Sequence, residues 1–171
     1  EIFLIIVGLL GADNAPPHKM DHPNTLIHLQ ELALEISKAP VKMRADLISL
    51  GYNESRFGYR YAFKGKMIES HGDCGVFQQR PRFAEGGKTT CKKLQSSKEA
   101  VKQAVAYVRY VNRRFGKEKY TVCHYNSGNS CDDNRDKKIN KKDRSVRYAI
   151  QHQAIKALVE KKALLNKIAM K

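Results

Sequence analysis

The segment PVKMRADLISLGYNESRF, at residues 40–57, is the clearest place from which to predict the fold. Pro40 suits the first turn of a helix, because its missing N–H group leaves no hydrogen bond unmade there. Apolar residues then recur at intervals of three and four, which predicts one buried stripe on a helix. The stripe consists of Val41, Ala45, Ile48 and Tyr52. This helix should end near Arg56 and hold Glu54 in its last turn.

Helical patterns also lie on both sides of this segment. Upstream, residues 24–36 carry apolar side chains at helical spacing, namely Leu26, Leu29, Ala33 and Ile36. Downstream, the strongest pattern begins with a capping box at 96–99 and ends at Gly116. A last helix is predicted from about Asp143, with the apolar stripe Val146, Ile150, Ala154, Leu158, Leu165 and Ile168.

Residues 58–87 follow neither period and are rich in glycine, aromatic and polar residues. A connector of this length usually carries function. Because no long alternating strand pattern appears, we predict a mainly α fold with at most a small β-hairpin in this stretch. The 171 residues and the 42% apolar content indicate one globular domain.

The chain carries 32 Lys and Arg residues against 17 Asp and Glu residues, a net charge of +15. Such a charge predicts a polyanionic partner, and three classes fit it: nucleic acid, an anionic membrane and an acidic cell-wall polymer. Composition alone does not choose among them.

The apolar run at residues 2–12 is too short to cross a bilayer, which takes about 20 residues. With the Asp-Asn-Ala-Pro-Pro sequence that follows, it is typical of the end of a secretory signal peptide. We therefore predict a signal remnant at 1–15 and one domain at 16–171, exported to the periplasm, the cell exterior or a virion. The alternative is that the run is a core segment.

The four cysteines are an even set, which in an oxidising compartment favours two disulfides. Proximity along the chain favours the pairs Cys74–Cys91 and Cys123–Cys131. A zinc site is the rival interpretation, but no two cysteines are as closely spaced as zinc ligands usually are, and the histidines do not cluster with them. We therefore expect no metal and no other cofactor.

Three local motifs carry groups that a sugar-binding cleft needs. Glu54 follows apolar and aromatic residues, where lost solvation would raise its pKa and suit it to act as a general acid. On this local evidence alone, a surface residue paired with Arg56 is the favoured interpretation. Gln78 ends a Gly-Val-Phe-Gln sequence, and Tyr125-Asn126 adds a ring and a second amide.

The order of these motifs, Glu54-Ser-Arg-Phe, Gly75-Val-Phe-Gln and Tyr125-Asn-Ser-Gly, resembles the lysozyme-like superfamily. The soluble lytic transglycosylases and goose-type lysozymes are the most similar families, and the resemblance covers residues 26–157. It implies a lysozyme-like helical domain that cleaves peptidoglycan between N-acetylmuramic acid and N-acetylglucosamine. Val76-Phe77 departs from the family's Leu-Met, and His124 replaces a small residue.

The resemblance also implies a role for individual residues. Glu54 falls on the catalytic acid, and Ser55 on its supporting neighbour. The cleft wall that binds the glycan would be formed by Gly75, Val76, Phe77 and Gln78. Tyr125 and Asn126 would line the acid and the sugar beside it. Tyr148 falls near a tyrosine that hydrogen-bonds the acid, although an ordinary buried aromatic fits that position as well.

The reaction depends on a second carboxylate, because an inverting hydrolase needs one to activate water whereas a lytic transglycosylase needs none. Glu69 and Asp73 are the candidates, and Glu85 is a weaker one. The motifs favour the transglycosylase, which leaves an anhydro-muramyl product. Hydrolysis of the same bond, as in goose-type enzymes, is the alternative.

Two other classes of protein remain open. Arg109, Arg113 and Arg114 share one predicted helix and suit a nucleic-acid binder. A catalytically silent wall-binding or virion component would keep the fold alone. We expect a monomer whose partners are glycan strands and anionic wall polymers, with no specific nucleic acid. The last helix should pack on its own domain, not on a membrane.

Overall fold

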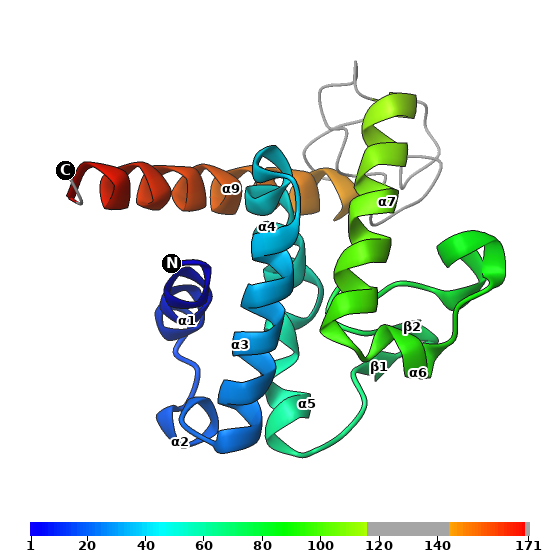
Figure 1. Ribbon diagram of the computed structural model, residues 1–171, viewed down its shortest axis with the longest axis horizontal. Helices are drawn as coiled ribbons and strands as arrows, with labels where there is room; N and C mark the ends of the chain where they lie inside the picture. The colour runs from blue at the N-terminus through cyan, green and yellow to red at the C-terminus, as the bar shows by residue number, and fades with distance from the viewer. Residues whose placement is uncertain (116–143, 170–171) are drawn as a thin grey trace.

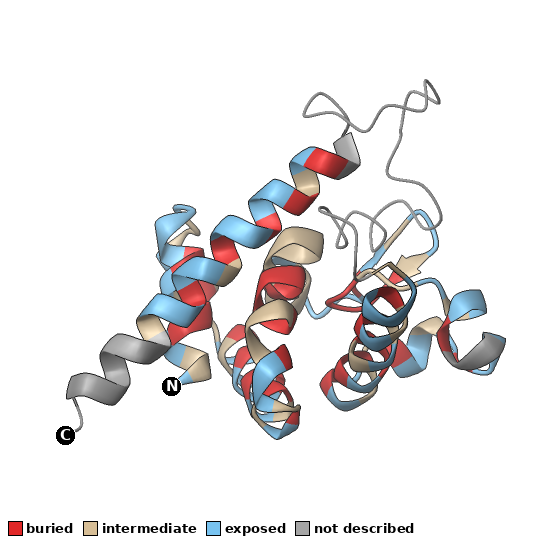
Figure 2. Ribbon diagram, turned by 90° about the horizontal axis from the view of Figure 1, so that it is seen from above, coloured by how far each residue is buried: buried red, intermediate tan, exposed pale blue. Residues whose placement is uncertain are grey.

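A computed structural model describes residues 1–115 and 144–169. Within these ranges the chain is mainly helical, with one two-stranded antiparallel hairpin (Figure 1). This confirms the predicted mainly α class and the small hairpin in the glycine-rich stretch. Buried residues lie between the helices and exposed residues cover their outer sides (Figure 2).

Helix α4 (Val41–Ser55) begins directly after Pro40, as predicted. It packs against α3, α7 and α9. Its buried residues are Met43, Leu47, Ile48, Ser49, Leu50 and Gly51. The predicted stripe was partly wrong, since Val41 is 72% exposed. Because several helices cover α4, its middle turns are buried on more sides than a single stripe describes.

Helices α3 (Pro23–Lys38) and α7 (Ser97–Phe115) pack against α4 and against each other. Helix α3 begins after His22, whose Nδ1 accepts a hydrogen bond from the Asn24 N–H group at 3.3 Å. It buries Leu29, Ala33 and Ile36 from the predicted stripe, together with Thr25 and Leu32. The burial of α7 follows its valines and alanines, at Ala100, Val101, Ala104, Val108 and Val111.

The apolar run near the N-terminus forms helix α1 (Ile2–Ala12), which packs against α3. It contributes four buried side chains to the core: Ile5, Ile6, Leu9 and Leu10. A short helix, α2 (Pro17–Met20), connects it to α3. The run is thus a core segment in this structure, and its removal as a signal remnant stays a prediction. Among the described residues, no helix combines the length and apolarity needed to cross a membrane.

Helix α9 (Arg144–Ala169) crosses the top of the view in Figure 1 and packs against α4. Its buried face is not the predicted stripe. The buried positions are Val146, Ala149, His152, Ile155 and Val159, whereas Ile150 and Leu158 are 38% and 42% exposed. Among the described positions, the buried face shares only Val146 with the predicted stripe, and it was missed because it contains a polar residue, His152.

The hairpin consists of β1 (Glu69–Ser70) and β2 (Asp73–Cys74), with Glu69 opposite Cys74. It follows α4 through η1 (Arg56–Gly58) and α5 (Tyr59–Phe63), and it precedes η2 (Pro81–Gly87) and α6 (Cys91–Leu94). The Cys74–Cys91 disulfide joins the hairpin to α6, which confirms the first predicted pair. The second pair, Cys123–Cys131, lies outside the described residues.

Candidate active site

Glu54 lies in the last turn of α4, half-buried, as the sequence predicted. The hydroxyl group of Tyr148, from α9, donates a hydrogen bond to Glu54 Oε1. These two residues are 94 positions apart in the chain, so only the packing of α9 on α4 brings them together. The contact that the resemblance implied for Tyr148 is therefore present.

The turn after Glu54 has an unusual backbone. Arg56, Phe57 and Gly58 all have positive φ angles, of 52°, 57° and 70°. A left-handed conformation is common for glycine but uncommon for a bulky residue such as phenylalanine. Such outliers persist only where the surroundings hold them, and they gather at functional sites.

Three contacts hold this turn in place. The ring of Phe57 is fully buried, and His28 Nε2 lies 2.8 Å from the Phe57 carbonyl oxygen. Because that oxygen can only accept, His28 must donate from Nε2. Burial lowers the pKa of His28, although the Phe57 hydrogen bond and nearby Glu31 oppose that change. On the other side of the turn, Ser55 Oγ donates to the Val76 carbonyl oxygen at 2.8 Å.

Arg56 pairs with Asp13 and not with Glu54. Its Nε donates to Asp13 Oδ2 at 2.7 Å and its Nη1 donates to the Tyr52 carbonyl oxygen at 2.8 Å. The guanidinium also stacks on the Tyr52 ring, 4.1 Å from the ring centroid. The interpretation of Glu54 as a surface residue paired with Arg56 is therefore wrong.

The predicted wall segment, 75–78, lies beside this turn because the Ser55–Val76 hydrogen bond ties it to the end of α4. Val76 and Phe77 are buried, so their side chains belong to the core and only their backbone can serve a ligand. Gln78 has a φ of 46°, and its Nε2 donates to the Gly75 carbonyl oxygen at 2.9 Å. That hydrogen bond sets the orientation of the Gln78 amide.

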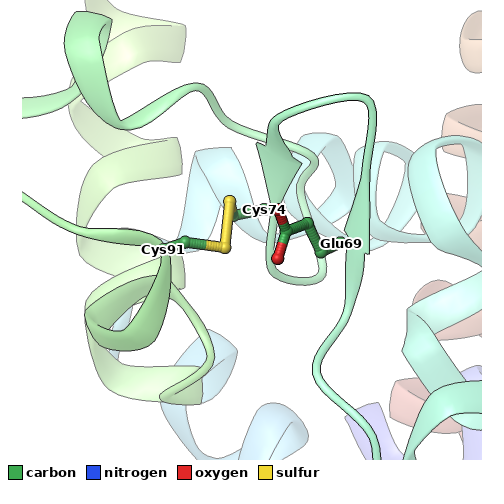
Figure 3. A group of neighbouring side chains, drawn as sticks. All are labelled: Glu69, Cys74 and Cys91. Carbon is green, nitrogen blue, oxygen red and sulfur yellow. A yellow bond between two sulfur atoms is a disulfide. The ribbon is translucent and has the colours of Figure 1, made fainter.

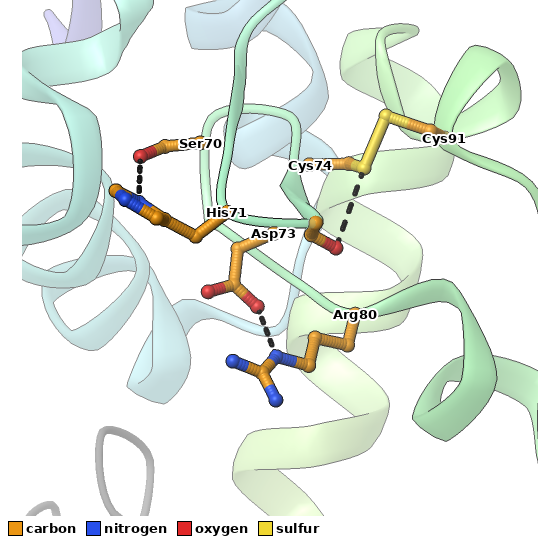
Figure 4. Close-up of polar contacts among 7 residues, drawn as sticks. Ser70, His71, Asp73, Cys74, Arg80 and Cys91 are labelled. Carbon is orange, nitrogen blue, oxygen red and sulfur yellow. Dashed lines mark hydrogen bonds and ion pairs between the residues drawn. A yellow bond between two sulfur atoms is a disulfide. The ribbon is translucent and has the colours of Figure 1, made fainter.

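Asp73 is one of the two candidates for a second carboxylate. Figure 4 shows it facing Arg80, whose Nε lies 2.7 Å from Asp73 Oδ1. On the same turn, Ser70 Oγ lies 2.9 Å from His71 Nδ1.

Glu69, the other candidate, lies near the disulfide (Figure 3). A carboxylate oxygen of Glu69 and the sulfur atoms of Cys74 and Cys91 all lie within 4.8 Å of one another, a grouping that could in principle hold a metal ion. The two sulfur atoms are bonded to each other, however, and a metal needs them as thiolates. In the oxidised state this cluster is therefore a covalent link and not a set of metal ligands.

Other predicted site residues lie outside the part of the chain that the structure describes. These are Tyr125 and Asn126, with His124 beside them. The backbone of Glu85 lies in η2, but its side chain is outside the description as well.

Four residues that were not predicted from the sequence connect α4 and the turn after it to other segments. They are Asp13, His28, Asp46 and His152. The sequence holds little signal for His28 and His152, because neither belongs to the apolar stripe predicted for its helix. A comparison of the chain with protein-family models, with curated proteins and with solved structures found no match.

Proposed function

We propose that this protein is a peptidoglycan-cleaving glycosidase that acts between N-acetylmuramic acid and N-acetylglucosamine, with Glu54 as its general acid and base. The observation that carries the proposal is the hydrogen bond from Tyr148 to Glu54. A carboxyl group at the end of a central helix is held by a residue from another helix, next to the backbone of the 75–78 segment. This arrangement orients an acid beside groups that can bind a sugar.

The first chemical step is proton donation. The Tyr148 hydroxyl group orients the Glu54 carboxyl group, and the protonated carboxyl group donates its proton to the glycosidic oxygen. Cleavage of the C1–O bond then gives a glucosamine hydroxyl as leaving group and a muramyl cation. The carboxylate of Glu54 next removes a proton from the C6 hydroxyl group of the same muramyl residue, whose oxygen closes on C1. The product is a 1,6-anhydro sugar, and Glu54 is protonated again.

The structure of the hairpin supports this lytic transglycosylase outcome over hydrolysis. Asp73 is engaged by Arg80, and Glu69 lies against the disulfide. The Asp73 oxygen that faces Arg80 is thus already engaged in an ion pair. Hydrolysis as in goose-type lysozymes is the alternative, and it would require one of these two carboxylates as general base.

The chain as a whole fits an exported enzyme of the lysozyme-like superfamily that works on an anionic wall. The Cys74–Cys91 disulfide is typical of proteins in oxidising compartments. The net charge of +15 would concentrate the enzyme on acidic wall polymers. We expect a monomer with no cofactor, since Glu54 and substrate groups supply every proton that the reaction moves.

The test is Glu54→Gln, which removes the acid but keeps the size of the side chain. Cleavage of purified sacculi should fall by at least about a hundredfold, the usual lower bound for a general acid. The matched control is Glu35→Gln on α3, which removes the charge from an ion pair with Lys38, whose side chain is 58% exposed. This control should cleave like the wild type. Equal activity in both variants would contradict the proposal and favour a catalytically silent wall-binding protein.

Mass spectrometry of the products identifies the reaction. Anhydro-muramyl ends support the transglycosylase, whereas reducing ends alone support hydrolysis. In that case Asp73→Asn and Glu69→Gln would identify the general base. A nucleic-acid binder would instead be retained on DNA at about 0.15 M salt with or without Glu54.

A further inference from the structure

Besides the Tyr148–Glu54 hydrogen bond, a second polar cluster joins α9 to α4. His152 Nε2 lies 3.1 Å from Asp46 Oδ1, and Lys156 Nζ lies 2.9 Å from the same oxygen. His152 is 1% exposed, and the side chain of Asp46 is 15% exposed. His152 and Asp46 therefore lie inside the contact between the two helices, whereas the Lys156 side chain, 33% exposed, lies at its rim.

A third contact strengthens this arrangement. Ser49 Oγ, which is buried on α4, donates to the backbone carbonyl oxygen of His152 at 2.9 Å. A hydrogen bond to the backbone of α9 depends on where that helix lies along α4 and not on a flexible side chain of α9. Together the contacts act on both the position and the rotation of α9.

The spacing of the contacts relates this cluster to the candidate acid. Tyr148 and Lys156 are eight residues apart on α9, and Glu54 and Asp46 are eight residues apart on α4. Eight residues span about 12 Å of helix, so the two pairs of partners match along helices that run in opposite directions. Tyr148 can meet Glu54 only if α9 keeps this alignment.

Apolar packing does not by itself impose such an alignment. The buried neighbours on α9 are Val146, Ala149, Ile155 and Val159, which would tolerate a small sliding or rotation of the helix. Buried polar partners are more exacting, because a misaligned helix would leave Asp46 without its donors. Burial would raise the pKa of Asp46, but the hydrogen bonds and charges of His152 and Lys156 lower it overall. Asp46 is therefore ionised near neutral pH and needs those donors.

We propose that His152, held by Asp46, is a positioning residue that aligns α9 on α4 so that the Tyr148 hydroxyl group meets Glu54. His152 does not touch the reacting atoms and acts through Tyr148. The inference rests on the proposed function for its catalytic consequence. Its structural consequence, the orientation of Tyr148 on Glu54, can be measured without any activity.

The experiment compares His152→Leu, Tyr148→Phe and the double variant in the full chain. The first readout is the pKa of Glu54 from a carbon-13 NMR titration, with the signal assigned by its loss in Glu54→Gln. Removing a donor from a carboxylate disfavours its charged form, so both single variants should raise this pKa. Both should lower kcat on purified glycan chains about tenfold, a modest loss for a hydrogen bond to a charged group, with KM within about twofold.

The double variant separates positioning from general stability. If His152 acts through Tyr148, His152→Leu should change neither the Glu54 pKa nor kcat further once Tyr148 is phenylalanine. His152→Gln, which keeps an N–H donor for Asp46, should restore kcat to within about twofold of the wild type. Val159→Ala, in the same helix contact, is the matched control. It should lower thermal stability but leave the Glu54 pKa unchanged.

Three results would overturn the inference. The first is an unchanged Glu54 pKa in His152→Leu, and the second is a kcat loss in the double variant equal to the product of the two single losses. The third is a change of the Glu54 pKa in Val159→Ala as large as the change in His152→Leu. If His152→Leu does not fold, Asp46→Asn makes the same test from the α4 side. If the wild type cleaves no peptidoglycan, the proposed function fails, and the NMR titration alone still decides the positioning role.

Discussion

At the scale of single residues, Gly75 shows how one backbone position controls the candidate site. Its φ is +71°, and a Cβ atom added there would lie 2.2 Å from the Leu94 carbonyl oxygen. Its N–H group donates to the Ile68 carbonyl oxygen at 2.8 Å, and its own carbonyl oxygen accepts from Gln78. The close approach to α6 and the orientation of the Gln78 amide therefore both depend on a glycine at this position.

Gly75→Ala should consequently destabilise the protein by about 2 kcal/mol or more, because it adds a clash with backbone to an unfavourable φ. Gly72→Ala is the matched control, since Gly72 also has a positive φ, of +80°, but nothing lies within 4 Å of its added Cβ. Thermal unfolding measures the loss of stability in each variant, and the difference between the two losses gives the cost of the clash with Leu94. Equal losses of stability would mean that α6 moves away from the added Cβ atom at little cost, so the close approach of Gly75 to α6 is not required.

At the scale of elements, the left-handed turn at η1 is held by a contact from α3. His28 donates to the Phe57 carbonyl oxygen, and its pKa is lowered mainly by burial. The folded protein therefore holds His28 neutral at a pH where the unfolded chain already binds a proton. This difference makes the stability of the turn depend on pH.

The sign follows from proton binding. Between the lowered folded pKa of His28 and its unfolded value of about 6.5, the unfolded state binds more protons, so stability rises with pH. The contribution of neutral His28 to the free energy of unfolding is complete above about pH 7 and declines as the pH falls below about 6.5. The pKa of Asp46 is lowered, so Asp46 loses its contribution to stability only when the pH falls below the ordinary value near 3.8. A change of stability between pH 5 and 7 is therefore attributable to histidine.

His28→Gln should flatten the dependence of the unfolding free energy on pH between 5 and 7. A glutamine can still donate to Phe57 but does not titrate. Urea denaturation at several pH values measures this, with His22→Gln at the exposed start of α3 as the control. An unchanged slope in His28→Gln would show that another group causes the pH dependence.

At the scale of the whole molecule, α1 is attached to the rest of the protein in two ways. Its four buried side chains contribute to the same core as those of α3 and α4. Asp13, just after α1, forms the ion pair with Arg56 in the turn that follows Glu54. The N-terminal segment therefore contacts both the core and the surroundings of the candidate acid.

Deletion of residues 1–15 should then cost several kcal/mol of stability, since burying each large aliphatic side chain is worth about 1.5–3 kcal/mol. Asp13→Asn separates the two attachments. It removes the charge from the partly exposed ion pair with Arg56 and alters the hydrogen bond with the Tyr52 side chain, and it should cost about 1 kcal/mol. Calorimetry of both proteins measures the difference. A truncated chain with undiminished stability and wall cleavage would instead support the removal of these residues as a signal remnant.

The sequence by itself determined the elements and the position of the candidate acid, because both follow from local patterns. The period of apolar residues predicts α3, α4 and α7, and chain proximity predicts the Cys74–Cys91 pair. Glu54 is in the last turn of α4 because that helix starts after a proline and ends at a left-handed turn.

Only the tertiary structure decided which partners these residues meet. Helix α9 buries the face that contains His152, and an apolar periodicity cannot identify a face whose polar residue pairs through Nε2 with a partner 106 positions away. Arg56 likewise pairs with Asp13 on a distant segment and not with its near neighbour Glu54. Tyr148 reaches Glu54 for the same reason. Polar side chains in a packed interior must find a hydrogen-bond partner, and which one they find depends on how helices meet in space.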